Sequence, residues 1–201
     1  MGRLALVVFA MCFALGLASQ AEAQAKARIE ANSVREPNRI LGAPIYSRAK
    51  VERYARSVGC THYILKAIPI YYRLAPLRNI RPDVLVAQAV LETSRGHYGG
   101  DSRPWNMAGI KKGGAVRDRP KDFEVPQNAR EGVRMHVNHM AAYTGKRAIG
   151  KPHDRYYEAR AAQRRRGWWV RKVSQLGNRV WATDPEYGDK IRRILHAMAK
   201  R

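Results

Sequence analysis

The sequence predicts a mainly α-helical domain with a small irregular or β-hairpin lobe beside a cleft. Most of residues 46–201 shows helical hydrophobic periodicity, with capping residues at the segment ends. Residues 99–127 differ, because they are rich in glycine and proline and hold few long apolar runs. Long loops inside compact domains are usually functional. No internal repeat is visible, so we expect one domain with one inserted lobe.

The N-terminal segment has the pattern of an export signal. Arg3 gives a short positive region, residues 4–17 are apolar, and Ala21-Glu22-Ala23 forms a small-x-small cleavage site. We therefore expect residues 1–23 to be a signal peptide, with an uncleaved signal anchor as the alternative. Residues 24–45 are polar and punctuated by proline and glycine, which predicts a linker. The mature protein is expected to be secreted or extracytoplasmic and associated with the cell wall.

The first half of the domain contains three helical segments. Ser47 can cap a helix that Gly59 closes, and Thr61 can cap a second one over residues 62–79, in which Pro69 marks a kink or a break. The third begins at Pro82, a favourable first helical position. Its residues 84–91 leave almost no polar side, so this helix should be buried all round.

Helical character returns after the lobe. The pattern over residues 127–145 has apolar positions at helical spacing. A further helix is expected at about residues 167–176, and a last one over residues 184–201, with Asp184 as its cap and Pro185 at its first position.

The net charge of +22 predicts attraction to polyanions. Nucleic acid, cell-wall polymers and anionic lipid heads all qualify, and charge alone does not choose among them; export argues against nucleic acid. Export also removes Cys12 and leaves Cys60 without a partner for an internal disulfide, so the fold must rest on its apolar core. We expect a monomer. The basic stretch 159–173 contains Trp168 and Trp169, one of which should be buried.

Glu92 is the most informative residue of the chain. It occupies the last turn of the apolar helix, where burial and the negative end of the helix dipole both raise the pKa of a carboxyl group. A glycosidase needs such a protonated acid to donate a proton to the leaving sugar oxygen. The alternative is a helix-end glutamate that points to water or pairs with Arg95.

Four blocks of sequence resemble the bacterial glucosaminidase domain. They are "VLVAQAVLETSRGHYGG", "PWNMAGIKK", "DFEVPQNAREGVRMHVNHMAAY" and "VWATDPEYGDKI", which follow one another in order between about residues 46 and 199. The resemblance is to the N-acetylglucosaminidase autolysins of glycoside hydrolase family 73, and it implies a lysozyme-like fold. The core signature is the pair Glu92-Thr93 followed by the box Asn106-Met107-Ala108-Gly109-Ile110-Lys111.

The resemblance implies roles for several residues. Glu92 would be the general acid, and Asn106 and Gly109 would shape the floor beside it, with Asn106 bonding either backbone or an acetamido group. Tyr187 matches a tyrosine that such domains bring back towards the acid, where its hydroxyl could orient Glu92; ordinary core packing is the alternative.

Two more residues are candidates for substrate binding. Trp105 lies next to the asparagine box and could stack on a sugar. Arg95 departs from the small or aromatic residue that is common after Glu-Thr; it should face outward or hold a substrate group, because pairing with Glu92 would lower the pKa of the acid.

The second carboxylate is the least determined part of the site. Asp118, Asp122 and Glu124 all lie in the irregular segment, and Asp118 is our choice because it sits at a loop tip; each could instead be an ordinary loop acid. His136 and His139 have metal-compatible spacing, but no third ligand is evident, so we expect no metal and no cofactor.

The sequence therefore predicts a peptidoglycan hydrolase that cuts the β-1,4 bond after N-acetylglucosamine, with glycan strands as its partner. One alternative is a catalytically inactive peptidoglycan-binding module. The other is a basic protein that binds polyanions such as nucleic acid or a membrane. Anionic wall polymers and lipid heads are further expected partners of the basic surface.

Overall fold

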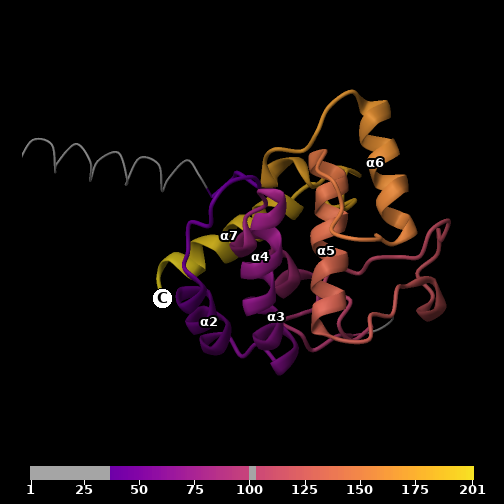
Figure 1. Cartoon of the computed structure of the whole chain (residues 1–201). Coiled ribbons are helices and arrows are strands. Elements are labelled where there is room, and N and C mark those ends of the chain that lie inside the picture. The colour runs from indigo at the N-terminus through magenta and orange to yellow at the C-terminus, as the bar shows by residue number, and fades with distance from the viewer. Residues whose placement is uncertain (1–36, 100–102) are drawn as a thin grey trace, which may run out of the picture. The chain divides into compact units, whose positions relative to one another are not determined.

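The computed structural model describes residues 37–99 and 103–201. The predicted signal peptide and residues 24–36 of the predicted linker lie outside this part of the chain. The described residues form six α-helices joined by turns and three short 3₁₀ helices (Figure 1). The α-helices are α2 (Arg48–Ser57), α3 (His62–Leu74), α4 (Pro82–Glu92), α5 (Ala129–Thr144), α6 (Asp154–Arg166) and α7 (Tyr187–Ala199), and the 3₁₀ helices are η1 (Ala75–Arg78), η2 (Pro120–Asp122) and η3 (Val173–Gln175).

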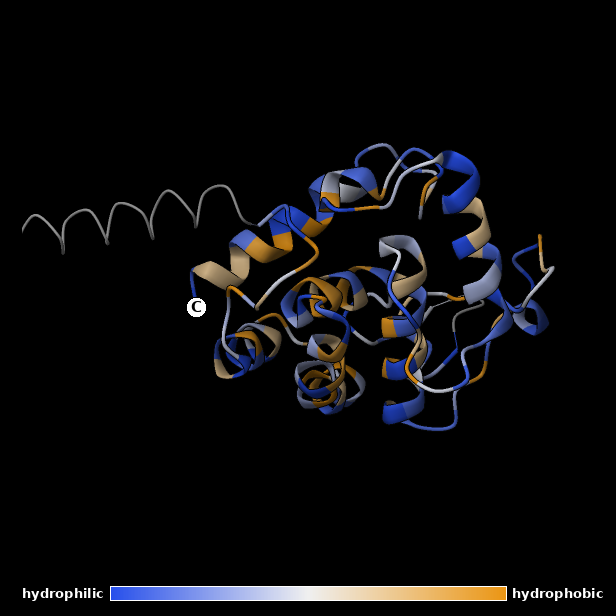
Figure 2. Ribbon diagram, turned by 45° about the horizontal axis from the view of Figure 1, so that its top comes forward, coloured by the Kyte–Doolittle hydropathy of each residue, from blue (hydrophilic) through white to orange (hydrophobic). Residues whose placement is uncertain are grey.

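Helix α4 lies at the centre of the domain. It packs against α3 and α7, α3 also packs against α2 and α5, and α5 packs against α6 (Figure 1). Every residue from Pro82 to Val90 is buried, which confirms the expectation of a helix without a polar face. Figure 2 shows the contrast with α6, which is mainly hydrophilic. No helix in the described ranges is long and apolar enough to cross a membrane.

The helix ends follow the predicted capping in part. The Ser47 hydroxyl accepts the Lys50 N–H at the start of α2, and the Asn128 side chain accepts the Glu131 N–H at the start of α5. Thr61 precedes α3 as expected, but its hydroxyl donates to the Gly96 carbonyl 2.9 Å away and does not cap the helix. The last helix begins at Tyr187, three residues after the predicted cap.

The helix expected at residues 167–176 is wrong. The helix of this region is α6, which ends at Arg166. Gly167 follows it with a φ of 76°, which stops the helix, and residues 173–175 form only η3. The hydrophobic pattern missed α6 because this helix buries only three residues, Tyr156, Ala159 and Gln163, and so has no strong apolar stripe. Its helix-favouring alanine, arginine and glutamate residues are the remaining signal.

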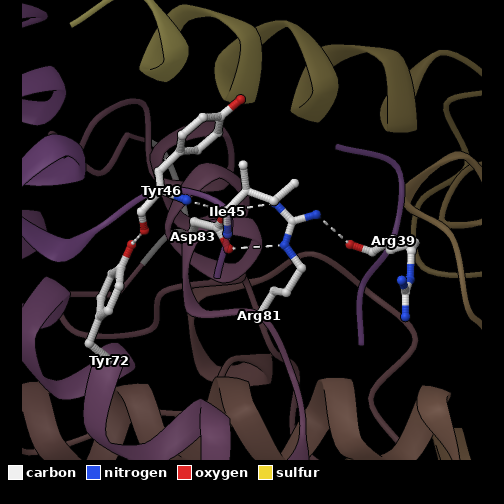
Figure 3. Close-up of polar contacts among 6 residues, drawn as sticks. All are labelled: Arg39, Ile45, Tyr46, Tyr72, Arg81 and Asp83. Carbon is white, nitrogen blue, oxygen red and sulfur yellow. Dashed lines mark hydrogen bonds and ion pairs between the residues drawn. The ribbon is translucent and has the colours of Figure 1, made fainter. Parts of the chain in front are cut away.

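A buried ion pair fixes the N-terminal end of α4 (Figure 3). Arg81 and Asp83 are 2% and 0% exposed and join through Nη2 and Oδ2 at 2.7 Å. Asp83 also accepts the backbone N–H groups of Ile45 and Tyr46, and Arg81 donates to the Arg39 carbonyl. Residues 37–45, placed in the predicted linker, therefore pack on the domain.

The inserted lobe is irregular in its described part, from residue 103 to about residue 128. A single antiparallel bridge joins Lys111 to Phe123, and η2 lies beside it. The β-hairpin alternative is not seen in these residues, because the backbone bonds next to this bridge do not extend into a ladder.

Candidate active site

The turn after α4 places Glu92 at the very end of the buried helix. Thr93 closes the helix, because its hydroxyl donates to the Ala89 carbonyl at 2.7 Å and accepts the Gly96 N–H at 2.9 Å. Gly96 has a φ of 87°, and a Cβ there would lie 2.3 Å from the Thr61 hydroxyl. Only glycine fits this turn without strain, so the chain reverses directly behind the acid.

The two oxygens of the Glu92 carboxyl have different surroundings. Oε1 accepts a hydrogen bond from the Tyr187 hydroxyl and a second one, at 3.2 Å, from Nε1 of Trp181. Oε2 faces Gly109, where a Cβ would lie 4.0 Å away. The φ of 57° at Gly109 also favours glycine. One oxygen is thus held by the protein, and the other borders a position that carries no side chain.

Burial raises the pKa of Glu92, while the hydrogen bonds from Tyr187 and Trp181 oppose this rise. Burial and the nearby carboxyl also raise the pKa of Tyr187 well above its usual range, so the phenol stays protonated and can donate. Arg95 is not among the groups that shift the pKa of Glu92. The site therefore holds a carboxyl group that keeps its proton to higher pH than an exposed glutamate.

Behind Tyr187, three buried side chains continue the hydrogen bonding into the core. Nε2 of Gln88 donates to the Tyr187 hydroxyl at 2.8 Å. Oε1 of Gln88 lies 3.0 Å from Nε2 of His136, and Nδ1 of His136 lies 2.6 Å from the Tyr71 hydroxyl. Gln88 and His136 are 0% exposed and Tyr71 is 1% exposed. The chain Tyr71–His136–Gln88–Tyr187–Glu92 links α3, α5, α4 and α7.

The side chain of Asn106 holds the asparagine box together by bonding to backbone groups. Asn106 is buried, and its Nδ2 donates to the carbonyls of Ile110 and Glu124 at 2.8 and 3.1 Å. Its Oδ1 accepts the Ile110 N–H at 2.8 Å. Asn106 thus fixes the loop that carries Gly109 and ties it to residue 124.

The three acids of the lobe differ in their environments. Asp118 has a side chain that is 78% exposed and pairs with Lys111 at 2.8 Å. Asp122 is bound by the Arg119 guanidinium, which lowers the pKa of that carboxyl. Burial raises the pKa of Glu124. Of the three, Glu124 is the one that the Asn106 amide holds through its backbone.

A surface groove of about 290 Å³ lies along α5 next to Glu124. Glu92 is not among the residues that line it, so the groove is not the immediate surroundings of the acid. It is lined by Glu124, Val125, Pro126, Glu131, Arg134, Met135, Asn138, Lys151, Pro152 and His153.

The two histidines with metal-compatible spacing, His136 and His139, both lie beside polar groups of the protein. His136 uses both ring nitrogens within the core chain, and Nδ1 of His139 lies 3.1 Å from Nε2 of His153. The described part of the chain holds no group of three or more histidine, cysteine or acidic side chains with the arrangement of a metal site.

Comparison with known proteins identifies the family of the domain that carries this site. The family described as glucosaminidase, mannosyl-glycoprotein endo-beta-N-acetylglucosaminidase, matches residues 68–200, which is most of the described domain. The chain belongs to the glucosaminidase family. No curated protein and no solved structure gives a significant match. The matched region begins within α3 and includes α4, the lobe, and the segment with Trp181 and Tyr187.

In this glucosaminidase domain, three of the predicted site residues come together. Glu92, Tyr187 and Gly109 meet at the end of α4, although residue 187 is 95 positions away in sequence from the acid. Asn106 adjoins them and bonds backbone, one of the two partners expected for it.

Other predicted residues lie apart from the acid. The Arg95 guanidinium donates to the Val58 carbonyl at 3.1 Å, so Arg95 faces outward, towards the end of α2. The Trp105 ring packs edge-on against Tyr63, at 4.7 Å between centroids, and against His62, at 6.3 Å. Trp105 is partly buried in an aromatic cluster on α3. Asp118 is bound to Lys111, as described above.

Sequence reasoning missed Trp181, Gln88 and His136. Trp181 lies in the same sequence block as Tyr187, which was the available signal. Gln88 lies four residues before Glu92, one helical turn away, and is the polar residue of an otherwise apolar stretch. A polar side chain that is fully buried needs a partner, and that rule singles out Gln88 for inspection.

Proposed function

We propose that this glucosaminidase domain hydrolyses the β-1,4 bond after N-acetylglucosamine in peptidoglycan, with Glu92 as the general acid. The observation that supports this role is the asymmetry of the Glu92 carboxyl: two donors hold Oε1, while Oε2 borders Gly109. Burial raises the pKa of the group, so it keeps its proton to higher pH than an exposed glutamate does, which favours an acid catalyst. Family membership supplies the class of bond.

In the proposed reaction, the proton on Oε2 passes to the glycosidic oxygen as its bond to the anomeric carbon breaks. The carboxylate that remains keeps the hydrogen bonds from Tyr187 and Trp181, which favour the charged form at that moment. Water, or the substrate acetamido group followed by water, attacks the anomeric carbon. The proton released by water restores the acid, so no atom is left over.

The second carboxylate belongs to the lobe in this proposal. Asp118 was the sequence-based choice, and its exposed side chain pairs with Lys111. Glu124 is the competing candidate, because Asn106 ties its backbone to the loop that carries Gly109. Asp118→Asn and Glu124→Gln separate them: only the residue that activates water should cost about 10²-fold or more in kcat.

The remaining contacts to the glycan are also proposals. Trp105 offers a partly exposed ring for stacking on a sugar, and Arg95 offers a cation outside the acid's immediate surroundings. We propose extracytoplasmic action on glycan strands, with the basic surface drawing the protein to anionic wall polymers.

Mass spectrometry of digested peptidoglycan tests the assignment. Wild-type protein should release fragments with N-acetylglucosamine at the new reducing end, and Glu92→Gln should release none. Full activity in Glu92→Gln would refute the role of the acid. Binding to peptidoglycan by a wild-type protein that does not cleave it would instead identify an inactive binding module.

A further inference from the structure

The buried chain behind Tyr187 has a direction that its chemistry fixes. An ionised Glu92 can only accept hydrogen bonds, so Tyr187 must donate to it. The Tyr187 oxygen then accepts from the Gln88 amide nitrogen at 2.8 Å. With its nitrogen used this way, Gln88 presents Oε1, a pure acceptor, to His136.

The same logic fixes the far end of the chain. Because Oε1 of Gln88 only accepts, Nε2 of His136 must carry a hydrogen. A neutral imidazole has one N–H, so Nδ1 is then an acceptor and the Tyr71 hydroxyl must donate to it at 2.6 Å. Burial lowers the pKa of His136 to about 3, which keeps the ring neutral. All hydrogen bonds in the chain therefore point towards Glu92.

Trp181 gives the chain a second, independent constraint. Its indole N–H can only donate, and it reaches Oε1 of Glu92 at 3.2 Å. A proton on Oε1 would face both this donor and the Tyr187 hydroxyl. With the Trp181 N–H and the Tyr187 hydroxyl both donating to Oε1, the hydrogen of a protonated Glu92 is placed on Oε2, the oxygen that borders Gly109.

We propose that Gln88, His136 and Tyr71 are positioning residues that act through Tyr187: they keep its hydroxyl a donor to Oε1 and so reserve Oε2 for the transferred proton. This inference rests on the proposed role of Glu92 as the acid. Without the chain, the Tyr187 hydroxyl could turn away from the carboxyl. Its polarised O–H bond would also weaken, because successive hydrogen bonds strengthen one another.

The other ionisable groups that act on residues of the chain or on their neighbours are tyrosines, histidines and two arginines. Tyr98 acts electrostatically on Tyr71, Tyr143 on Tyr187, and His136 on His139; burial raises the pKa of Tyr98 and of Tyr143 and lowers that of His139. His153, beside His139, has its pKa lowered to about 4. Arg155 and Arg166 act on Tyr143 from α6. A change of the Glu92 pKa in the variants below is thus traceable to the chain itself.

The first test uses the unmodified protein and needs no activity. Nitrogen-15 NMR of the His136 ring distinguishes the two neutral tautomers from the charged form. We expect the Nε2–H tautomer, unchanged well above the pKa of about 3. An Nδ1–H tautomer would overturn the proposal, because the chain would then run in the opposite direction and take the donor away from Glu92.

The second test measures the pKa of Glu92 by carbon-13 NMR of its carboxyl, assigned with Glu92→Gln. We expect the pKa to rise in Tyr187→Phe, less in Gln88→Met and least in Tyr71→Phe. Thr144→Val is the matched control: it also deletes one buried hydroxyl, which donates within α5 to the Met140 carbonyl, outside the chain. It should lower Tm but leave the pKa of Glu92 unchanged.

Kinetics on peptidoglycan complete the design. Gln88→Met and Tyr71→Phe should lower kcat about two- to ten-fold with KM unchanged, the effect of one weakened hydrogen bond. Folded variants that lose only Tm and keep both the pKa of Glu92 and kcat would reduce these residues to structural ones and overturn the proposal. Retained activity in Glu92→Gln would refute the proposed function separately, because the NMR measurements stand without turnover.

Discussion

At the scale of single residues, the candidate site balances opposing effects on one carboxyl group. Burial at the end of α4 favours protonated Glu92, while the hydrogen bonds from Tyr187 and Trp181 favour the ionised form. A general acid must be protonated before the reaction and stable as an anion just after it. The separation of the two roles, with donors at Oε1 and the proton on Oε2, meets both demands.

Tyr187→Phe should move the alkaline limb of the pH–activity profile. Activity falls as pH rises through the pKa of the acid, and the Tyr187 bond lowers that pKa, so its removal should shift the limb to higher pH. We expect kcat to fall about ten- to hundred-fold, since a hydrogen bond to a charged group is lost. The profile of kcat/KM measures this. Tyr156→Phe, which loses a hydroxyl bonded to the Lys146 carbonyl, is the control and should leave the limb in place; a limb that stays put in Tyr187→Phe contradicts the assignment.

Glu92→Gln should raise stability at neutral pH. The pKa of Glu92 in the folded protein lies above the unfolded value of about 4.3, so ionisation costs stability as pH rises above that value. Glutamine removes this cost, and its oxygen can still accept from Tyr187 and Trp181. Thermal unfolding should show a higher Tm for the variant at neutral pH and no such gain at about pH 3.5. The exposed Glu186→Gln should stay within about 0.5 kcal/mol of the wild type.

At the scale of elements, α4 is fixed at both ends. The Arg81–Asp83 pair holds its first turn, and the Thr93–Gly96 turn closes its last one. Since every residue from Pro82 to Val90 is buried, the helix has no freedom to rotate, and the position of Glu92 follows from the two anchors. Each anchor can be removed separately.

Asp83→Asn should destabilise the domain by about 3–5 kcal/mol, because it breaks a buried ion pair by removing the carboxylate that contacts Arg81. The segment at Ile45 and Tyr46 would also lose its acceptor. Chemical denaturation gives the free energy of unfolding. The comparison is Asp189→Asn, which removes an exposed ion pair with Arg192 and should cost less than about 1 kcal/mol. Similar losses in the two variants would refute the importance of burial.

Gly96→Ala should disturb the turn behind Glu92. The new Cβ would meet the Thr61 hydroxyl at 2.3 Å and the φ of 87° would be strained, at a cost of about 1–3 kcal/mol. Gly99→Ala has no heavy atom within 4 Å of its Cβ and serves as the control. If Gly96→Ala matched this control in both Tm and kcat, the turn would not be what positions the acid.

The sequence predicts those features of the site that local patterns encode. Burial of α4 and the place of Glu92 follow from one continuous stretch, and Tyr187 was placed near the acid through family resemblance. The link from Gln88 to His136 joins residues 48 positions apart. It depends on the packing of α4 against α3 and α7 and on the packing of α3 against α5, which no local sequence pattern specifies. Helix α6 was not predicted for a different reason: most of its residues are polar, and its three buried residues are too few to give a recognisable apolar pattern.

At the scale of the whole molecule, the net charge of +22 attracts polyanions over longer distances than the contacts within the site. Part of this charge lies on α6, whose last turn carries Arg164, Arg165 and Arg166. A field of this sign raises the local concentration of an anionic polymer and speeds association with it, without affecting the bond-breaking step. Catalysis and attraction to the wall should therefore respond differently to salt.

Raising the salt concentration from about 50 to about 500 mM should slow turnover of anionic peptidoglycan, because it shortens the screening length to a few ångström. Turnover of a soluble, uncharged β-1,4-linked N-acetylglucosamine oligomer should change little. The double variant Arg164→Glu/Arg165→Glu should reduce the salt dependence on peptidoglycan, whereas Arg164→Lys/Arg165→Lys keeps the charge and should behave as the wild type. Both sites are exposed, so neither variant should alter Tm appreciably. Equal salt dependence on the charged and uncharged substrates would show that the basic surface has no part in reaching the substrate.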